Sequence, residues 1–192
     1  MRLLPIYRLI SWLLFPPITL ALTVALATRN FFSGRESLFW IILVGVVGYG
    51  VEIVYFFLLW MRHRTDFDVK NKDIRERLLK MSVVSLTSVC IIVLLLTEAI
   101  VLQKILFAAA VINLLFVVAL DLFKMELSFH IGMLTMLVFY AAAYVSYRYI
   151  PLGSVLLLLT GLSRHKLKMH TLSELVIGFM ISAVVYGLVL WL

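Results

Sequence analysis

Residues 38–61 read LFWIILVGVVGYGVEIVYFFLLWM, an apolar run that contains one charged side chain, Glu52. A helix needs about 20 residues to cross the hydrocarbon core of a bilayer, so this run is long enough to span one. Trp40 and Trp60 stand near its two ends, and tryptophan is enriched where helices meet the membrane interface. The run therefore predicts a membrane-spanning helix.

Composition extends this prediction to the whole 192-residue chain, of which 64% is hydrophobic and 14% is charged. Soluble domains are roughly 45–50% apolar and about 25% charged, so this chain has too few polar side chains to cover a water-soluble fold. The same argument excludes a disordered chain, a nucleic-acid-binding module and a disulfide scaffold, and the single cysteine, Cys90, can form no intrachain bridge. The other apolar runs are residues 9–28, 81–96, 105–123, 131–147, 152–162 and 175–192.

These runs predict an all-α fold, a polytopic transmembrane bundle of six or seven helices. The number stays open because residues 152–162 form a run shorter than the roughly 17–25 residues usual for a crossing. No hydrophilic stretch is long enough to predict a separate soluble domain. Residues 1–192 are therefore expected to form one integral membrane domain, with two N-terminal helices in 1–61 and a motif-bearing core in 62–192.

Positive charges gather on one side of the predicted bundle, and the formal net charge of the chain is +7. If seven helices cross the membrane, the N-terminus and residues 62–80, 124–130 and 163–174 share a side and carry 13 of the 17 lysines and arginines. Cytoplasmic loops carry an excess of these residues, so we expect the basic side to face the cytoplasm. The remaining four are Arg29, Arg35, Lys104 and Arg148.

Three short segments on the basic side carry residues suited to phosphate chemistry. Residues 70–77 read KNKDIRER, residues 128–130 read SFH, and residues 163–174 read SRHKLKMHTLSE. His170 and Glu174 are four positions apart, so on a helix they share a face and the carboxylate can hold one imidazole nitrogen. The other nitrogen is then free to act as a nucleophile or base.

The remaining polar residues of these segments would complete such a site. Arg77 and Arg164 can each clamp phosphate oxygens with two parallel hydrogen bonds, and Lys70 can add a point charge. A protonated His130 can give its proton to a leaving alkoxide. Two histidines and three cations around one pocket form a coherent apparatus for phosphoryl transfer.

The three segments resemble the signature of the type 2 phosphatidic acid phosphatase superfamily, a group of integral membrane lipid phosphatases. The family motifs are Lys-x6-Arg-Pro, Pro-Ser-Gly-His and Ser-Arg-x5-His-x3-Asp, and this chain keeps their order and internal spacing over residues 66–192. The matching residues are Lys70 and Arg77, then Ser128 and His130, then Ser163, Arg164 and His170.

The chain departs from the family pattern at four motif positions. Leu78 and Leu127 replace prolines, Phe129 replaces a glycine, and Glu174 replaces the aspartate. Two predicted helices also separate the first motif from the second. Lys124, just before the second motif, is therefore a further candidate for a cation role.

The resemblance implies a two-step hydrolysis of a lipid phosphomonoester or pyrophosphate that uses no metal or cofactor. His170 would attack phosphorus and become phosphorylated, Glu174 would orient its ring, and His130 would protonate the departing lipid oxygen. The groups expected to stabilise charge on the phosphate oxygens are Lys70, Arg77, Arg164, Ser128 and Ser163.

The expected partners follow from the same resemblance. They are a lipid phosphate substrate and the surrounding membrane lipids, with no nucleic acid. The family acts on phosphatidic acid, phosphatidylglycerophosphate, polyprenyl phosphates and lipid A phosphates, and nothing in the sequence selects among them. The expected location is a bacterial inner membrane.

Two other functions remain open at the level of sequence. The altered motifs favour a catalytically inactive, phosphatase-like subunit that binds lipid or supports a larger membrane complex. A weaker alternative is a haem-binding electron carrier that uses His130 and His170, because histidines on facing helices can ligate iron. Glu52 has two possible roles. It is either functional, as a partner to an active-site cation or as a proton site, or it is a protonated or hydrogen-bonded acid in a helix interface.

Overall fold

The computed structural model describes residues 4–29, 31–61 and 71–191, and within these ranges the chain is helical and contains no strand. The helical segments are α1 (Leu4–Leu13), α2 (Pro16–Thr28), α3 (Gly34–Met61), α4 (Lys72–Leu96), α5 (Ile100–Phe123), α6 (Phe129–Tyr140), the π-helical turn η1 (Ala141–Val145), α7 (Tyr149–Lys166) and α8 (Leu172–Trp191).

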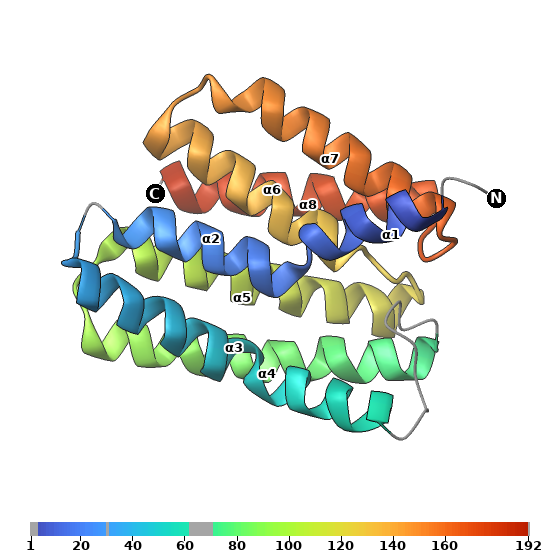
Figure 1. The fold of residues 1–192 in the computed structure, drawn as a ribbon, viewed down its shortest axis with the longest axis horizontal. Helices are drawn as coiled ribbons and strands as arrows, with labels where there is room; N and C mark the ends of the chain where they lie inside the picture. The colour runs from blue at the N-terminus through green and yellow to red at the C-terminus, as the bar shows by residue number, and fades with distance from the viewer. Residues whose placement is uncertain (1–3, 30, 62–70, 192) are drawn as a thin grey trace.

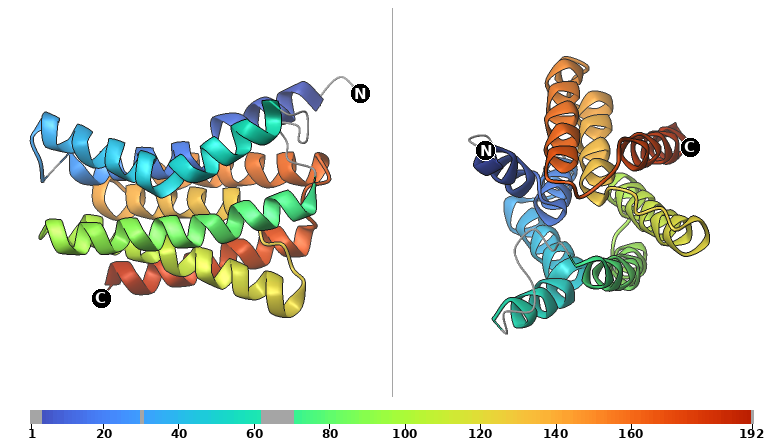
Figure 2. Two further views of the ribbon diagram at one scale, coloured as in Figure 1. Left: turned by 90° about the horizontal axis from the view of Figure 1, so that it is seen from below. Right: turned by 90° about the vertical axis from the view of Figure 1, so that its right-hand side faces the viewer.

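These segments run back and forth along one direction and form a single bundle (Figure 1). α2 follows α1 after a short break at residues 14–15, and α6 continues directly into η1. α4 packs against α3 and α5, while α6 packs against α2, α7 and α8, as the end-on view of Figure 2 shows. The predicted all-α helical bundle is confirmed.

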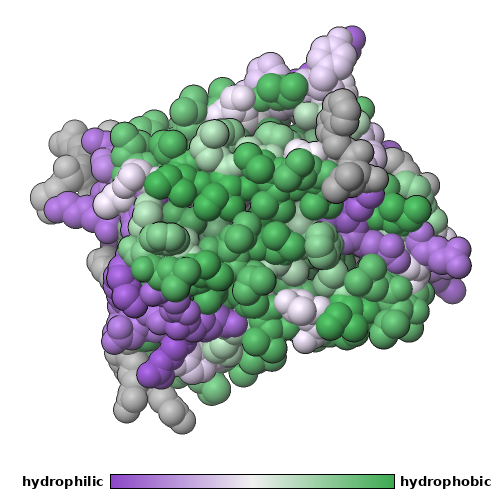
Figure 3. Space-filling view, turned by 180° about the vertical axis from the view of Figure 1, so that it is seen from behind, coloured by the Kyte–Doolittle hydropathy of each residue, from purple (hydrophilic) through white to green (hydrophobic). Residues whose placement is uncertain are grey.

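The surface of the bundle matches the predicted membrane character. Within the described ranges, five spans are long and apolar enough to cross a bilayer, and the shorter apolar stretch Phe129–Val145 accompanies them. Apolar side chains cover the middle of the face shown in Figure 3, and hydrophilic side chains gather toward its two ends. This arrangement is that of a multi-pass membrane protein. The five spans are Pro5–Thr28, Gly34–Met61, Lys72–Leu96, Ile100–Phe123 and Leu172–Leu190.

Close packing and one interhelical hydrogen bond connect α4 to α5. Leu86 and Val89 of α4 and Ile112 of α5 are fully buried in the bundle. The Ser82 hydroxyl donates to the Asn113 side-chain oxygen over 3.0 Å. Inside a membrane, helices associate through van der Waals packing and such polar contacts, because lipid is as apolar as the side chains.

The run at residues 9–28 is not one continuous helix, as the sequence suggested, but is interrupted before Pro16. Proline lacks a backbone N–H and disfavours helical backbone in the residue before it, so Phe15 is extended, with φ −60° and ψ 136°. Pro16 and Pro17 then occupy the first turn of α2, where the missing N–H groups cost nothing. The break lets α1 leave the line of α2 and pass over α7, which it contacts.

The first motif is helical rather than part of a long polar loop, which corrects the expectation for residues 62–80 over their described part. α4 begins at Lys72 because the Asn71 side chain accepts hydrogen bonds from the backbone N–H groups of Asp73 and Ile74, at 3.0 and 3.3 Å. Asparagine is a preferred N-cap residue for this reason. Because residues 75 and 77 are both helical, Arg75 and Arg77 lie on different faces of α4.

α7 lies very close to α6 at Gly153. A Cβ atom at this position would lie 2.4 Å from Cγ1 of Val138, a β-branched side chain with little rotamer freedom. We expect Gly153→Ala to lower the free energy of unfolding by about 1–3 kcal/mol through overpacking, measured by thermal unfolding in detergent.

Gly161→Ala is the matched control on the same helix. A Cβ atom there would meet only Cδ1 of Ile131 at 3.9 Å, an ordinary contact. Since alanine favours helices over glycine by about 1 kcal/mol, this variant should be as stable as the wild type or more stable. Equal stabilisation by both substitutions would contradict the close approach at Gly153.

Candidate active site

A cavity of about 530 Å³ lies toward the basic end of the bundle, the end at which α3, α5 and α7 finish and α4, α6 and α8 begin. Its wall is mainly apolar and comes from α1 to α4 and the start of α6, with Trp12, Phe15, Ile53, Phe56, Leu79 and Phe129 among its residues. The polar and charged residues on the wall are Ser11, Tyr49, Glu52, Arg75, Glu76, Ser82, Glu126, His130, Arg164 and His170.

His170 is held in one orientation by the loop that connects α5 to α6. Its Nδ1 atom lies 2.8 Å from the backbone carbonyl oxygen of Glu126. A carbonyl oxygen only accepts hydrogen bonds, so Nδ1 carries the proton and the lone pair of a neutral ring is on Nε2. His170 is 8% exposed and lines the cavity. The arrangement is that of an imidazole held through one nitrogen with the other available for chemistry.

Glu174 supports His170 indirectly, because its main hydrogen bonds cap α8. Its carboxylate accepts from the Thr171 backbone N–H at 2.8 Å and from the Thr171 hydroxyl at 3.0 Å, while its own N–H donates to that hydroxyl at 3.3 Å. This reciprocal pair is a capping box. The carboxylate oxygen Oε2 is 3.9 Å from His170 Nδ1, an ion-pair distance rather than a hydrogen bond. Glu174 itself does not line the cavity.

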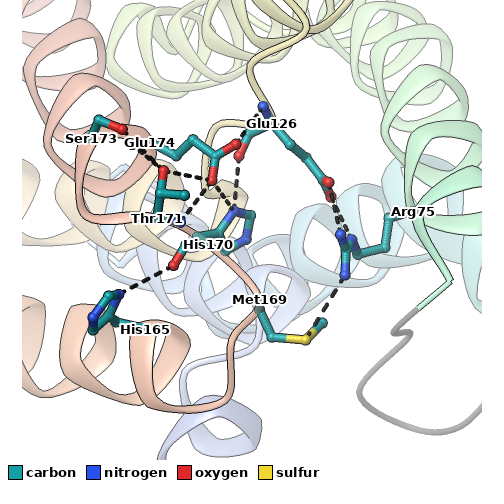
Figure 4. Close-up of polar contacts among 8 residues, drawn as sticks. All are labelled: Arg75, Glu126, His165, Met169, His170, Thr171, Ser173 and Glu174. Carbon is teal, nitrogen blue, oxygen red and sulfur yellow. Dashed lines mark hydrogen bonds and ion pairs between the residues drawn. The ribbon is translucent and has the colours of Figure 1, made fainter.

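Glu126 connects three separate segments at the site (Figure 4). Its backbone carbonyl accepts from His170, and its backbone N–H donates to Glu174 Oε1 at 3.1 Å. Its carboxylate receives two hydrogen bonds from Arg75 of α4, from Nε at 2.5 Å and from Nη2 at 2.8 Å. One residue thus fixes the loop after α5 to the start of α4 and to the loop before α8.

Burial is the main reason that the pKa of His170 falls to about 4. Removing an imidazolium from water is unfavourable, and the positive charge of Arg164 lowers the pKa further, while the Glu126 carbonyl and Glu174 oppose the shift. His170 is therefore neutral at pH 7. A neutral ring with a free Nε2 lone pair is the form that a nucleophile requires.

This pKa predicts a specific loss of stability in acid. Between pH 6.5, the usual pKa of an unfolded histidine, and about 4 the unfolded chain binds a proton that folded His170 does not. The free energy of unfolding should fall by roughly 3 kcal/mol as the pH drops through this window, and remain constant above it. Thermal unfolding of the wild type and of His170→Asn across pH 4–8 isolates this contribution, because the difference in stability between them should change with pH only if the pKa of folded His170 is lowered.

His130 and Arg164 complete the polar side of the cavity. His130 is the second residue of α6, and its ring lies 6.1 Å from the ring of Phe15. Arg164 lies in the last turn of α7, is 6% exposed, and donates from Nη1 to the Ser11 hydroxyl at 2.9 Å. The structure thus brings together His130, Arg164 and His170, three residues that the motifs single out.

The other candidates from the motifs lie elsewhere, apart from Lys70, which falls outside the described residues. Arg77 is exposed and does not line the cavity, because it occupies a different face of α4 from Arg75. Lys124 is also exposed and caps α5 with left-handed backbone, φ 56°. The expected phosphate contact of Arg77 and the expected cation role of Lys124 therefore need correction.

The two motif serines are fully buried but do not form part of the cavity wall. The Ser163 hydroxyl donates to the backbone carbonyl of Tyr7 and so fastens α1 to α7. Ser128 precedes α6 and packs against α8, where a Cβ atom added at Gly178 would lie 3.5 Å from its backbone nitrogen. In this conformation both serines serve packing rather than phosphate contact.

Sequence reasoning missed Arg75, Glu126 and Ser11. Arg75 stands two residues before Arg77, and the choice between them depends on where α4 begins. The Asn71 cap is the one local signal that would have indicated it. Glu126 lies two residues after Lys124, yet its partner is Arg75, 51 positions away in the sequence. Asp121, the other acid near Lys124, pairs with Lys80 at 3.0 Å.

No group of three or more histidine, cysteine, aspartate or glutamate side chains in the described ranges is arranged to hold a metal ion. Comparisons of the chain with family models, with curated proteins and with solved structures found no match. The chemistry of the site must therefore be argued from its own residues.

Proposed function

We propose that the protein is a membrane phosphatase that removes phosphate from a lipid phosphate through a phosphohistidine intermediate. The observation that carries the proposal is that His130, Arg164 and His170, from three separate segments, line one cavity whose remaining wall is mostly apolar. The polar side suits a phosphate group, and the apolar wall suits a lipid chain. The resemblance of the motifs to lipid phosphatases supports the same assignment.

The first chemical step transfers the phosphoryl group to the enzyme. Nε2 of His170 attacks phosphorus, the bond from phosphorus to the lipid oxygen breaks, and a protonated His130 gives its proton to that oxygen and becomes neutral. The Glu126 carbonyl, 2.8 Å from Nδ1, and the Glu174 carboxylate, 3.9 Å away, stabilise the positive charge that develops on the imidazole. Arg164 stabilises the charge on the phosphate oxygens.

The second step restores the enzyme. A water molecule gives a proton to His130 and attacks the phosphohistidine, which releases inorganic phosphate and returns His170 to its neutral form. Arg75 lies on the cavity wall where the resemblance led us to expect Arg77. Its bond to Glu126 positions the loop that holds His170, so Arg75 contributes positive potential at the site while it keeps the nucleophile in place.

A panel of lipid phosphates tests the proposal. Purified protein in mixed micelles with excess chelator should release inorganic phosphate from at least one of phosphatidic acid, phosphatidylglycerophosphate, a polyprenyl phosphate or a lysophosphatidic acid. Absence of release from every member, by protein that unfolds cooperatively, would overturn the proposal. We expect the protein in a bacterial inner membrane, which immunodetection in separated membrane fractions of the host checks.

One observation favours a second candidate, an inactive subunit that binds lipid phosphates. Both cations on the wall are engaged with protein groups: Arg75 binds Glu126 with two hydrogen bonds, and Arg164 donates to Ser11. A subunit of this kind would bind the same lipids without hydrolysing them. Binding without phosphate release, together with co-purification of other membrane proteins, would identify it.

A further inference from the structure

A second polar feature lies in the same cavity, on the wall that α3 contributes. Tyr49 and Glu52 are three positions apart, so they share one face of α3, and both line the cavity. Tyr49 is 3% exposed and Glu52 is 7% exposed. Neither the Tyr49 hydroxyl nor either carboxylate oxygen of Glu52 has a hydrogen-bond partner among the residues that the structure describes.

Such groups are costly to bury alone. A buried hydroxyl or carboxyl without a partner loses its hydrogen bonds to water and gains none in return. Ser85 is a polar neighbour of Glu52, yet it makes no hydrogen bond of normal distance and angle with the carboxyl. The two arginines of the cavity bind Glu126 and Ser11 instead. The expectation that Glu52 pairs with an active-site cation is therefore not met among the described residues.

Tyr49 and Glu52 line the same cavity as His130 and His170, the histidines of the proposed reaction. The ring of Tyr49 lies 6.4 Å from the ring of Phe129, the residue immediately before His130. Glu52 is one helical turn from Tyr49 toward the end of α3, which is the basic end. The pair thus lines the same cavity as the proposed phosphate site.

We propose that Glu52 and Tyr49 bind a hydrogen-bond donor, a hydroxyl or an ammonium group, which the lipid substrate carries near its phosphate. This inference rests on the proposed function and deepens it, because it names the substrate class. Carboxylate oxygens accept hydrogen bonds from either donor, and the tyrosine hydroxyl can accept or donate. The substrates are then lipid phosphates with a free hydroxyl or amine on the backbone, and not simple alkyl or polyprenyl phosphates.

Three phosphates of equal chain length measure this preference: an alkyl phosphate without a donor, a lysophosphatidic acid with a hydroxyl, and a sphingoid base phosphate with a hydroxyl and an ammonium. Wild-type kcat/KM should favour at least one donor-bearing lipid over the alkyl phosphate by about 10-fold or more, because a site built to bind a donor rejects the analogue that lacks it. Glu52→Met, which removes the acceptor at similar length, should reduce the preference to about twofold or less. Glu36→Met, on the same helix but outside the cavity, should retain it.

Glu52→Gln separates the two donors. The amide oxygen still accepts from a hydroxyl, so a retained preference identifies the hydroxyl as the bound group. A preference lost with glutamine identifies the ammonium, since an uncharged side chain no longer balances a cation.

Binding to the His170→Asn variant, with and without Glu52→Met, gives a readout that does not depend on hydrolysis. If the wild type hydrolyses lipid phosphates but Glu52→Met leaves the preference unchanged, the inference on Glu52 is overturned and the proposed function stands. If the wild type hydrolyses none of the lipids, the proposed function fails, and the inference on Glu52 is then tested by the binding measurement alone. The inference on Glu52 is supported if His170→Asn binds a donor-bearing lipid more tightly than the alkyl phosphate and Glu52→Met removes this preference. Equal binding of all three lipids overturns the inference.

Discussion

His170→Asn should lower phosphate release by at least about 1,000-fold while leaving the fold intact, because it removes the nucleophile of the proposed reaction. The asparagine amide can still donate to the Glu126 carbonyl from nearly the position of Nδ1, which lies 2.8 Å from it in the wild type. What disappears is Nε2, the atom that attacks phosphorus. The measurement is kcat on the preferred lipid phosphate, with thermal unfolding in detergent to verify folding.

His165→Asn is the matched control for this experiment. His165 is exposed on the last turn of α7, five residues from His170, and does not line the cavity. Its variant should keep kcat within about twofold of the wild type. A His170→Asn protein that kept more than a tenth of wild-type activity would show that the nucleophile is another group.

Glu126→Gln should produce the largest loss of stability of any variant at the site, about 2–4 kcal/mol in the free energy of unfolding. The substitution keeps the size of the side chain but removes the carboxylate charge that the Arg75 guanidinium, whose side chain is 18% exposed, binds in the wild type. Breaking one partner of a buried ion pair is strongly destabilising, and the partial exposure of both side chains reduces the cost somewhat. Activity should also fall by about 10- to 100-fold, because the loop that holds His170 loses its attachment to α4.

A double-mutant cycle assigns this loss to the pair. Arg75→Met combined with Glu126→Gln should be less destabilising than the sum of the single variants, by about 1–3 kcal/mol. Lys80→Met supplies the comparison on the same helix, since Lys80 is 44% exposed and pairs with Glu76 and Asp121 at the surface. Its loss should lower the free energy of unfolding much less than Arg75→Met or Glu126→Gln does, because exposed ion pairs contribute little. Strictly additive effects of Arg75→Met and Glu126→Gln would contradict the role given to Glu126.

Much of the fold could be predicted because each helix has its own local signal. Apolar runs of bilayer length identify the spans, but hydropathy alone did not predict the break before Pro16 that divides residues 9–28 between α1 and α2. The boundary of α4 was missed because residues 72–80 are polar, although Asn71 followed by Asp73 is a recognisable helix start. Polarity alone does not separate a loop from a helix that extends beyond the apolar core of the membrane.

The site was predictable where its residues are close in sequence. The spacing between Arg164 and His170 is local, and the structure brings both to one cavity with His130. Arg75 and Glu126 were missed because they lie 51 positions apart and their pairing depends on how two helix ends meet. Glu174 was expected to orient His170, but a local pattern indicates another role. Thr171-Leu172-Ser173-Glu174 has the spacing of a capping box, and this role takes most of the hydrogen bonds of the Glu174 carboxylate.

Trapping the covalent intermediate tests the central claim most directly. Wild-type protein mixed with a lipid phosphate labelled at phosphorus, and quenched in alkali within milliseconds, should carry the label on a peptide that contains His170. The bond should be stable in alkali and labile in acid, as expected for a phosphohistidine. His170→Asn should carry no label. A label on another residue would contradict the account, as would a wild-type protein that releases phosphate and never becomes labelled at His170.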